Sequence, residues 1–280
     1  MPGKLYLCAT PIGNLKDMPP RAVEILKSAD LIAAEDTRNS IKLLNHFDIR
    51  TPMTAYHEYN RFDKAEELVK KILDEMTVAC ITDAGTPGIS DPGEVLAAKC
   101  IEAGIEVSTV PGPSACIAAL VISGLPTRRF RFEAFLPTEK KERQEILENL
   151  KDDAATLIFY EAPHRLVKTL SELYTALGDR RVSVCKELTK VHESVLRTTL
   201  SGAIVYFGKE EPRGEYVLVV EGRTIAELAE EAQQAWQEMS VEEHLQRYLS
   251  SGMDRMEAMK QVAKDRGLSK RDVYRELNKN

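Results

Sequence analysis

The sequence predicts an α/β fold with mostly parallel sheets. Short apolar runs bounded by turn residues alternate with amphipathic stretches, which is the pattern of strands that alternate with helices. In the stretch Lys64–Met76, for example, apolar side chains recur every three or four residues and form one face of a helix. Strands joined by such helices run parallel in most α/β proteins. The expected strands are Lys4–Ala9, Leu31–Ala34, Met53–His57, Val78–Thr82, Glu106–Val110, Phe130–Phe135, Thr156–Tyr160, Val182–Glu187 and Tyr216–Val220.

The length of 280 residues is about twice that of an average domain, so more than one domain is expected. Pro111, Gly112 and Pro113 interrupt the chain before a helix of small residues, and after Gly222 the strand signals cease. We therefore expect an N-terminal α/β domain over 1–113, a second α/β domain over 114–223 and a helical tail over 224–280.

The tail contains three short helix patterns. Ser240 and Ser269 each precede an acidic residue by three positions, as in a capping box, and Gly252 and Gly267 separate the patterns. This arrangement resembles a helix-turn-helix unit. Seven Lys or Arg against three acidic residues between Lys260 and Lys279 give that segment a charge of +4. Two interpretations are open, a nucleic-acid contact and a solvated helical cap.

Composition excludes several classes of protein. A net charge of −6 argues against a protein that coats nucleic acid, although a local basic patch is compatible with it. The five cysteines are odd in number and far apart, which favours reduced core thiols over disulfides or a zinc site. The longest apolar run, Ala115–Leu125, is too short to span a membrane, and no leader peptide pattern opens the sequence. A cytoplasmic protein is expected.

Common catalytic motifs are absent from the sequence. It has no GxGxxG after the first strand, no phosphate loop ending in GK[ST], no HExxH, no paired CxxC and no GxSxG. Readings as a Rossmann dehydrogenase, a nucleoside triphosphatase, a zinc hydrolase or a serine hydrolase therefore lack their usual support.

The segment DAGTPGISDPG, Asp83–Gly93, is the most informative motif in the chain. Its three glycines and two prolines follow a predicted strand and form a rigid turn whose backbone can approach a ligand closely. Ligands of open α/β sheets bind at the carboxyl ends of the strands, where this loop is expected. An ordinary strand-to-helix connection is shorter, so the loop favours a binding site.

Six further polar clusters also follow predicted strands, and a seventh, GEY, precedes one. Clusters this numerous along one edge of two sheets predict a single cleft between the two α/β domains. Taken singly, each charged residue is more often a capping or ion-pair residue than a catalyst, and Asp36 could cap the helix after it. The clusters are TPIGN, AEDTR, YHEYN, PGPSA, YEAPHR, KELTKVHE and GEY.

The order of TPIGN, AEDTR, DAGTPGISDPG, PGPSA, YEAPHR, KELTK and GEYVLVV resembles the ribosomal RNA small subunit methyltransferase I family of the tetrapyrrole methylase superfamily. The resemblance covers residues 3–222, and the helical tail is similar to that family's C-terminal helix-turn-helix segment. It implies the two-domain tetrapyrrole methylase-like fold, in which the cofactor lies between the α/β domains. It also implies a homodimer.

The activity that the resemblance implies is transfer of a methyl group from S-adenosylmethionine to the ribose 2′-hydroxyl of a cytidine in the decoding region of 16S ribosomal RNA. The substrate is then 16S rRNA or the small ribosomal subunit, and no metal is required. Carried over residue by residue, the cofactor contacts are Pro11, Gly85, Thr86, Pro87, Gly88, Ile89, Ser90, Ser114, Ala115, Tyr160, Leu188, Gly214 and Glu215.

A general base for the hydroxyl is expected among the carboxylates near strand ends. Asp36 and Glu187 are the preferred candidates, and Lys186 is expected to stabilise the developing alkoxide. Glu58, Glu193, His57, His164 and His192 are the alternatives. Phosphates around the target are expected to meet Arg38, Arg61, Arg165, Lys190 and the run Arg128, Arg129, Arg131.

Two other functions are compatible with the residues. One is a methyltransferase of the same superfamily acting on a tetrapyrrole or a protein side chain. The other is a regulator whose α/β part senses a small ligand and whose tail reads DNA, although one short basic helix usually needs a dimer with spaced half-sites. The basic tail favours RNA over the first alternative.

Overall fold

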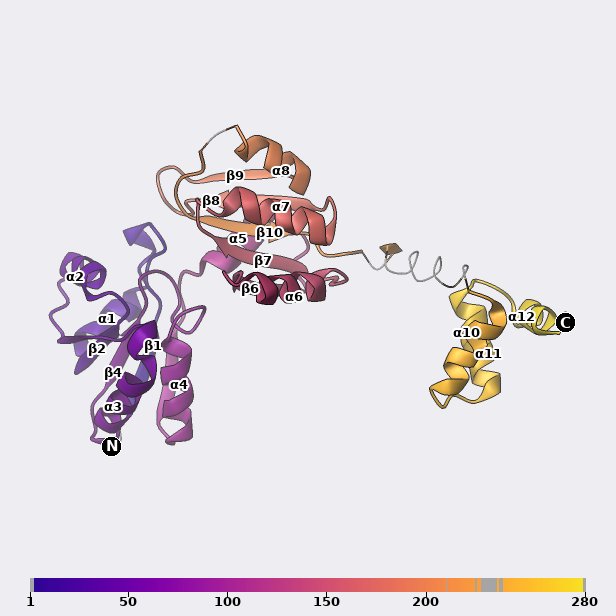
Figure 1. Cartoon of the computed structure of the whole chain (residues 1–280). Coiled ribbons are helices and arrows are strands. Elements are labelled where there is room, and N and C mark those ends of the chain that lie inside the picture. The colour runs from indigo at the N-terminus through magenta and orange to yellow at the C-terminus, as the bar shows by residue number, and fades with distance from the viewer. Residues whose placement is uncertain (1–2, 210, 225, 228–235, 237–238, 279–280) are drawn as a thin grey trace. The chain divides into compact units, whose positions relative to one another are not determined.

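The computed structural model describes residues 3–209, 211–224, 226–227, 236 and 239–278 (Figure 1). The chain forms two compact units. The larger comprises Met1–Glu148 with Thr156–Glu221 and contains both β-sheets, whereas the smaller comprises Asn149–Ala155 with Gly222–Asn280. The boundary expected between residues 113 and 114 lies inside the larger unit and stays a prediction.

The first sheet has five strands in the order β3-β2-β4-β1-β5, and all of its neighbours are parallel. Parallel strands need crossover connections, which the helices between them supply. The carboxyl ends of the strands therefore lie along one edge, where the loops that follow them gather. The strands are β1 (Lys4–Cys8), β2 (Leu31–Ala34), β3 (Met53–Ala55), β4 (Val78–Ile81) and β5 (Glu106–Val110).

Helices cover both faces of this sheet (Figure 1). Alternate side chains of a strand point to opposite faces, so Leu5 packs with α3 and α4, whereas Cys8 packs with α1 and α2. Both faces are consequently buried at the centre of the sheet, which explains why β2 and β4 are apolar throughout. The helices are α1 (Pro20–Ser28), α2 (Thr37–His46), α3 (Arg61–Leu73) and α4 (Gly93–Glu102), with short 3-10 turns η1 (Leu15–Asp17) and η2 (Glu58–Asn60).

The second sheet has the strand order β6-β7-β10-β8-β9. Only β6 and β7 are parallel, and the other three pairs are antiparallel. The expected parallel pairing thus holds throughout the first sheet. In the second sheet it holds for only one pair, β6 and β7. The strands are β6 (Phe130–Phe135), β7 (Thr156–Glu161), β8 (Arg181–Lys186), β9 (Ser194–Thr199) and β10 (Tyr216–Val220).

Four helices accompany the second sheet. The side chains of α5 form a buried cluster with Ile158, Cys185 and Val217, so α5 covers one face. Helix α8 packs against β8, β9 and α7. The helices are α5 (Ala115–Ser123), α6 (Lys140–Leu150), α7 (Leu166–Leu177) and α8 (Leu200–Phe207).

Three short helices form the tail, α10 (Val241–Ser250), α11 (Arg255–Asp265) and α12 (Lys270–Leu277). They share a small core of their own that includes Leu245 and Val262. Ser240 makes the expected capping box with Glu243, and the Ser269 hydroxyl accepts a hydrogen bond from the backbone N–H of Asp272. The three predicted helix patterns are confirmed within residues 239–278.

Several other expectations are also confirmed. All five cysteines are buried and free of disulfides. Strands β2, β5, β6 and β10 have the predicted bounds.

One strand, β9, was not expected, because its sequence SVLRTT is only half-buried at the edge of the sheet. Within the described part of the chain, no helix combines the length and the apolar character needed to cross a membrane.

Candidate active site

A pocket of about 390 Å³ lies in the larger unit. The loops that follow β1 and β4 form one part of its wall, and the start of α5, the ends of β6 and β7 and the start of β10 form the rest. The lining residues are Ile12, Thr82, Asp83, Ala84, Gly85, Thr86, Ile89, Ser90, Asp91, Ser114, Ala115, Phe135, Tyr160, Glu161, Ala162, Pro163, Glu215, Tyr216 and Val217.

The Asp83–Gly93 loop is fixed to its neighbours by backbone hydrogen bonds. Thr10 and Gly85 exchange two of them, with N···O distances of 2.8 and 3.1 Å. Gly85 has φ +91° and Gly88 has φ +85°, a region that side chains disfavour. The hydroxyl of Thr86 also donates to the carbonyl of Pro113, at 2.9 Å. The glycines thus let the chain turn sharply and leave its backbone open to the pocket.

The carboxylate of Asp91 closes this loop from within. It accepts hydrogen bonds from the backbone N–H groups of Gly88, Ile89 and Gly93, with distances of 2.8–3.3 Å. A Cβ atom at Gly93 would lie 2.8 Å from an Asp91 carboxylate oxygen, so only glycine fits there. Burial raises the pKa of Asp91, partly offset by the N–H donors. Asp91 therefore holds the shape of the loop.

Tyr160 joins the second sheet to the start of α5. Its hydroxyl oxygen accepts a hydrogen bond from the backbone N–H of Cys116, at 3.2 Å. Burial raises the pKa of this phenol well above its usual range, so it stays protonated. The rings of Phe132 and Phe135 both lie edge-on to it, with centroids 4.9 and 5.6 Å away. Tyr160 therefore forms a fixed aromatic wall of the pocket.

Two acidic residues occupy the carboxyl ends of β2 and β4. Glu35 accepts hydrogen bonds from the Thr82 hydroxyl and from the backbone N–H of Asp83. Asp83 in turn accepts from the backbone N–H of Asp36 and the side-chain amide of Asn39. Burial raises the pKa of Asp83 above the ordinary 3.8, and the nearby Glu35 charge adds to the effect. Asp83, like Asp91, therefore takes up a proton more readily than an ordinary aspartate.

Glu161 is a buried carboxylate in the wall. It accepts a hydrogen bond from the Thr169 hydroxyl and lies 3.5 Å from the guanidinium of Arg165. Its partners compensate for its burial, which indicates a structural role. Across the residues that the structure describes, His, Cys, Asp and Glu form no group of three that could bind a metal ion.

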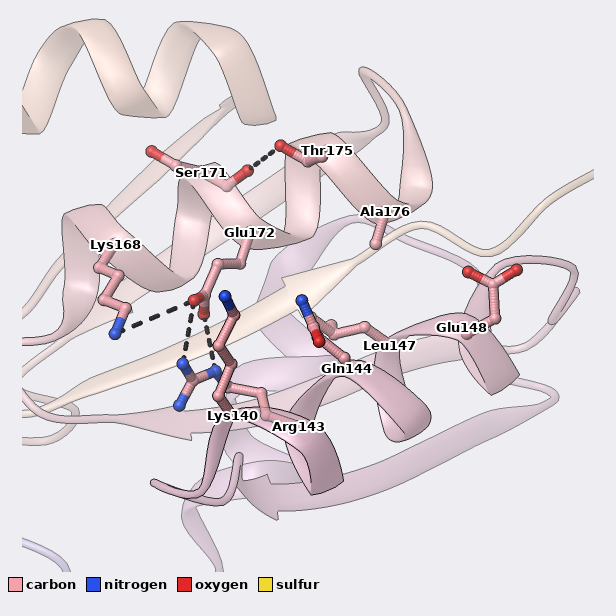
Figure 2. Close-up of a pocket in the computed structure, with 10 residues that line it drawn as sticks. All are labelled: Lys140, Arg143, Gln144, Leu147, Glu148, Lys168, Ser171, Glu172, Thr175 and Ala176. Carbon is pink, nitrogen blue, oxygen red and sulfur yellow. Dashed lines mark hydrogen bonds and ion pairs between the residues drawn. The ribbon is translucent and has the colours of Figure 1, made fainter.

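A second groove, of about 680 Å³, lies between α6 and α7 (Figure 2). Figure 2 shows Arg143 of α6 and Lys168 of α7 both directed at Glu172. Arg143 is almost fully buried and also donates to the carbonyls of Pro137 and Thr138. The N–H groups of Arg143 donate to the two carbonyls and to Glu172. They hold α6 and α7 together, so Arg143 does not serve as a catalytic group of this groove.

The family model of the Tetrapyrrole (Corrin/Porphyrin) Methylases matches residues 4–204. Proteins named ribosomal RNA small subunit methyltransferase I match almost the whole chain. That of Halalkalibacterium halodurans is 48% identical, with 97% of this chain and 93% of the relative covered. That of Synechocystis is 49% identical, with coverages of 97% and 96%. The chain belongs to the ribosomal RNA small subunit methyltransferase I family. It is therefore a methyltransferase.

Solved structures share the fold of this methyltransferase at low sequence identity. A diphthine synthase has a TM-score of 0.62 at 13% identity, covering 79% of this chain and 91% of its own. A Thermus thermophilus uroporphyrin-III C-methyltransferase complexed with S-adenyl homocysteine has a TM-score of 0.55 at 19% identity, with coverages of 78% and 97%. These neighbours confirm the tetrapyrrole methylase fold.

The pocket of the methyltransferase brings together most of the cofactor residues named from the sequence. Gly85, Thr86, Ile89 and Ser90 lie in the β4 loop, and the others come from α5, β7 and the segment before β10. Pro87 and Gly88 belong to the same loop but are not in the lining. Leu188 packs in the core beside α5, and Pro11 and Gly214 are also outside the lining. The lining residues from outside the loop are Ser114, Ala115, Tyr160 and Glu215.

The three residues predicted for catalysis lie outside the lining. Asp36 caps α2 and pairs with Arg38, which lowers the Asp36 pKa to about 2. Glu187 accepts a hydrogen bond from the backbone N–H of Glu215 and forms an ion pair with Lys190. Lys186 lines a different, smaller pocket of about 180 Å³. Their catalytic roles stay predictions.

Eleven of the lining residues were not named as site residues from the sequence, and four of them bear on the chemistry of the site. Asp83 and Asp91 stand inside the motif that identified the loop, and their carboxylates were a sufficient signal. Glu161 follows Tyr160 in YEAPHR and was readable in the same way. Phe135 had no signal, because regular alternation along β6 would direct it to the other face.

Proposed function

We propose that this methyltransferase transfers the methyl group of S-adenosylmethionine to the ribose 2′-hydroxyl of cytidine 1402 in the decoding region of 16S rRNA. The observation that carries the proposal is the pocket, which gathers Gly85, Ser114 and Tyr160 from distant parts of the sequence. These are residues that the family resemblance assigns to the cofactor. The relatives that match nearly the whole chain are named for the ribosomal small subunit, which supports the RNA substrate.

The residues of the pocket fit S-adenosylmethionine. A volume of about 390 Å³ lies within the range of small-molecule sites, ~300–1,000 Å³. Ile12, Ala115 and Val217 supply apolar wall, and the glycine loop supplies open backbone groups. The carboxylates of Asp83 and Glu215 give the lining negative charge, which suits a cofactor that carries a sulfonium and an ammonium group.

When bound, the cofactor supplies a methyl group on a positively charged sulfur. The main task of the protein is then to hold the hydroxyl in line with that bond, which can lower a barrier by up to ~7–11 kcal/mol. The loop closed by Asp91 and the wall formed by Tyr160 are the rigid features that would hold the reactants in position. Both are fixed by hydrogen bonds rather than by long flexible side chains.

Asp83 is the carboxylate best suited to accept the hydroxyl proton. It lines the pocket, whereas the side chain of Asp36 is turned toward Arg38. Its raised pKa makes it a stronger base than an ordinary aspartate. Glu161 and Asp91 line the pocket too, but Glu161 is almost fully buried and Asp91 accepts hydrogen bonds from three backbone N–H groups of its own loop. Asp83 is exposed and accepts from one backbone N–H and one side-chain amide.

The RNA is proposed to meet exposed basic side chains. Arg38, Arg61 and Arg165 form ion pairs within the chain, and so does Lys190. Arg128 and Arg129 are also exposed and directly precede β6. The tail exposes further cations, Lys260, Lys264, Lys270, Arg271 and Arg275.

The remaining parts of the proposal concern location and assembly. An enzyme acting on 16S rRNA or the assembled small subunit works in the cytoplasm, where those particles form. A homodimer is the assembly that the family resemblance implies, and sedimentation of the purified chain tests it.

The function is tested with purified protein, labelled S-adenosylmethionine and small subunits from cells that lack the gene. Digestion of the RNA to nucleosides should yield labelled 2′-O-methylcytidine. Label in a base, in protein or in a tetrapyrrole would support one of the other superfamily activities. Sequence-specific binding to duplex DNA at physiological salt, without methyl transfer, would support the regulator.

A further inference from the structure

Strand β6 contains an irregularity directly beside the pocket. Its pairing with β7 runs in step from Phe130 to Phe132, then skips one residue, so that Ala134 lies opposite Phe159 and Phe135 opposite Tyr160. One residue more on β6 than on β7 is a β-bulge. Ala134, at this bulge, has φ +51°, a backbone conformation that residues other than glycine rarely adopt.

The bulge changes the face on which Phe135 lies. Paired residues of neighbouring strands point to the same face of a sheet, and faces alternate with each residue. Phe132 pairs with Ile158, and Phe135 pairs with Tyr160, two residues further along β7. Phe132 and Phe135 therefore share one face although they are three residues apart. Without the extra residue, Phe135 would point away from the pocket.

The redirected ring lies at the rim of the pocket. Phe135 lines the pocket and its edge contacts Tyr160, yet the residue remains 51% exposed. The hydroxyl of Tyr160 is held by a hydrogen bond from the backbone N–H of Cys116. A strained turn that places a large apolar ring in solvent costs free energy, which is typical of positions that serve a ligand.

We propose that the ring of Phe135 stacks on the base of the nucleotide whose ribose is methylated. This inference rests on the proposed function, since it names the residue that orients the substrate of that reaction. Single-stranded RNA bases are commonly held by stacking on exposed aromatic side chains. A base placed there brings its own ribose to the mouth of the pocket.

The exposure of the ring favours the RNA base over the cofactor. Small-molecule ligands are usually enclosed over most of their surface, so their contacts come from buried lining such as Tyr216 and Val217. Phe135 instead presents half of its surface outward. The lining that the resemblance assigned to the cofactor lies on elements other than β6, namely the β4 loop, the start of α5, β7 and the segment before β10.

The test compares Phe135→Ala, Phe135→Leu and Phe135→Tyr in the full chain. The assay measures kcat and KM with unmethylated small subunits, and calorimetry measures the Kd for S-adenosylhomocysteine. Loss of one base stack corresponds to roughly 5- to 150-fold in affinity. The matched control is Phe130→Ala, which removes another half-exposed ring from the same strand, outside the pocket.

We expect Phe135→Ala and Phe135→Leu to lower kcat/KM for the subunit by at least fivefold, with the cofactor Kd within twofold. Phe135→Tyr, which keeps the ring, should restore most of the loss, and Phe130→Ala should behave as the wild type. Wild-type kinetics in Phe135→Leu would overturn the inference, as would an equal loss of cofactor affinity. An inactive wild-type enzyme would instead refute the proposed function, and the inference with it.

Discussion

The carboxylate of Asp83 accepts a hydrogen bond from the backbone N–H of Asp36, with 3.1 Å between Oδ1 and N. The two aspartates are therefore neighbours, but their side chains have different surroundings. Asp36 turns to Arg38 at the start of α2, and Asp83 lines the pocket. This separation makes the pair a controlled comparison of two carboxylates at the same sheet edge.

Replacing Asp83 with Asn should slow methyl transfer strongly. A positioned general base contributes ~10²–10⁴ in rate, so we expect Asp83→Asn to lower the single-turnover rate at least about 100-fold. Cofactor affinity should stay within a few fold, because the side chain keeps its shape. Asp36→Asn is the control, since asparagine also caps helices well. Similar rates in all three proteins would mean that positioning alone suffices.

The pH dependence of the rate should reflect the same carboxyl group. A base must be deprotonated to act, so the single-turnover rate should fall as the pH is lowered through the pKa of Asp83. Because burial raises that pKa above 3.8, the fall should begin at less acidic pH than for an ordinary aspartate. Stopped-time assays across pH check this, and an unchanged acid limb in Asp83→Asn would assign it to another group.

A side chain at Gly88 should weaken cofactor binding. Both Gly88, with φ +85°, and Gly104, with φ +72°, adopt the left-handed region, so alanine at either should cost ~1–2 kcal/mol of stability. Only Gly88 belongs to the loop that Asp91 closes, whereas Gly104 faces open space after α4. We expect Gly88→Ala to weaken S-adenosylmethionine binding at least tenfold by calorimetry.

The comparison with Gly104→Ala separates binding from folding. That variant should lose similar stability in thermal unfolding but keep wild-type affinity. If Gly88→Ala also binds normally, the loop does not contact the cofactor. If both bind weakly, the loss reflects general destabilisation.

The tail should contribute to RNA binding through its exposed cations. Each Lys or Arg on a phosphate releases a counterion. The double change Lys270→Glu with Arg271→Glu should therefore reduce the slope of log affinity for the subunit against log salt concentration by roughly one per lost contact. KM for the subunit should rise while cofactor affinity stays constant. Acidic residues at the start of α12 suit the helix dipole, so the tail should stay folded.

The control for the tail replaces Lys27 and Lys42, exposed lysines of α1 and α2, with Glu. It makes the same change in net charge away from the tail. Equal salt slopes for the tail variant and the wild type would show that the tail is a structural cap or a contact between subunits.

The sequence was sufficient for the elements whose residues are buried on both sides. Leu31–Ala34 and Tyr216–Val220 are fully buried, and their continuous apolar runs predicted both strands correctly. Strand β9 was missed because it lies at the edge of the second sheet and its residues are only partly buried. Strand direction in that sheet was also unpredictable, since it depends on pairing between distant segments.

The candidate site was predictable where a motif fixed the backbone. The glycines of the Asp83–Gly93 loop predicted a binding turn, and the pocket is built on it. The roles of single carboxylates were not predictable, because Asp36, Asp83 and Glu187 all stand near strand ends in the sequence and only the fold decides which of them lines the pocket. Phe135 depends on a bulge of one residue, which periodicity cannot anticipate.

Whether this chain methylates a ribose of 16S rRNA can be measured by mass spectrometry of the 16S rRNA nucleosides and fragments from cells with and without the gene. We expect one 2′-O-methylcytidine, at position 1402, to disappear without the gene. It should return with the wild-type chain but not with Asp83→Asn. An identical set of methylated nucleosides in both strains would show that this chain does not methylate 16S rRNA.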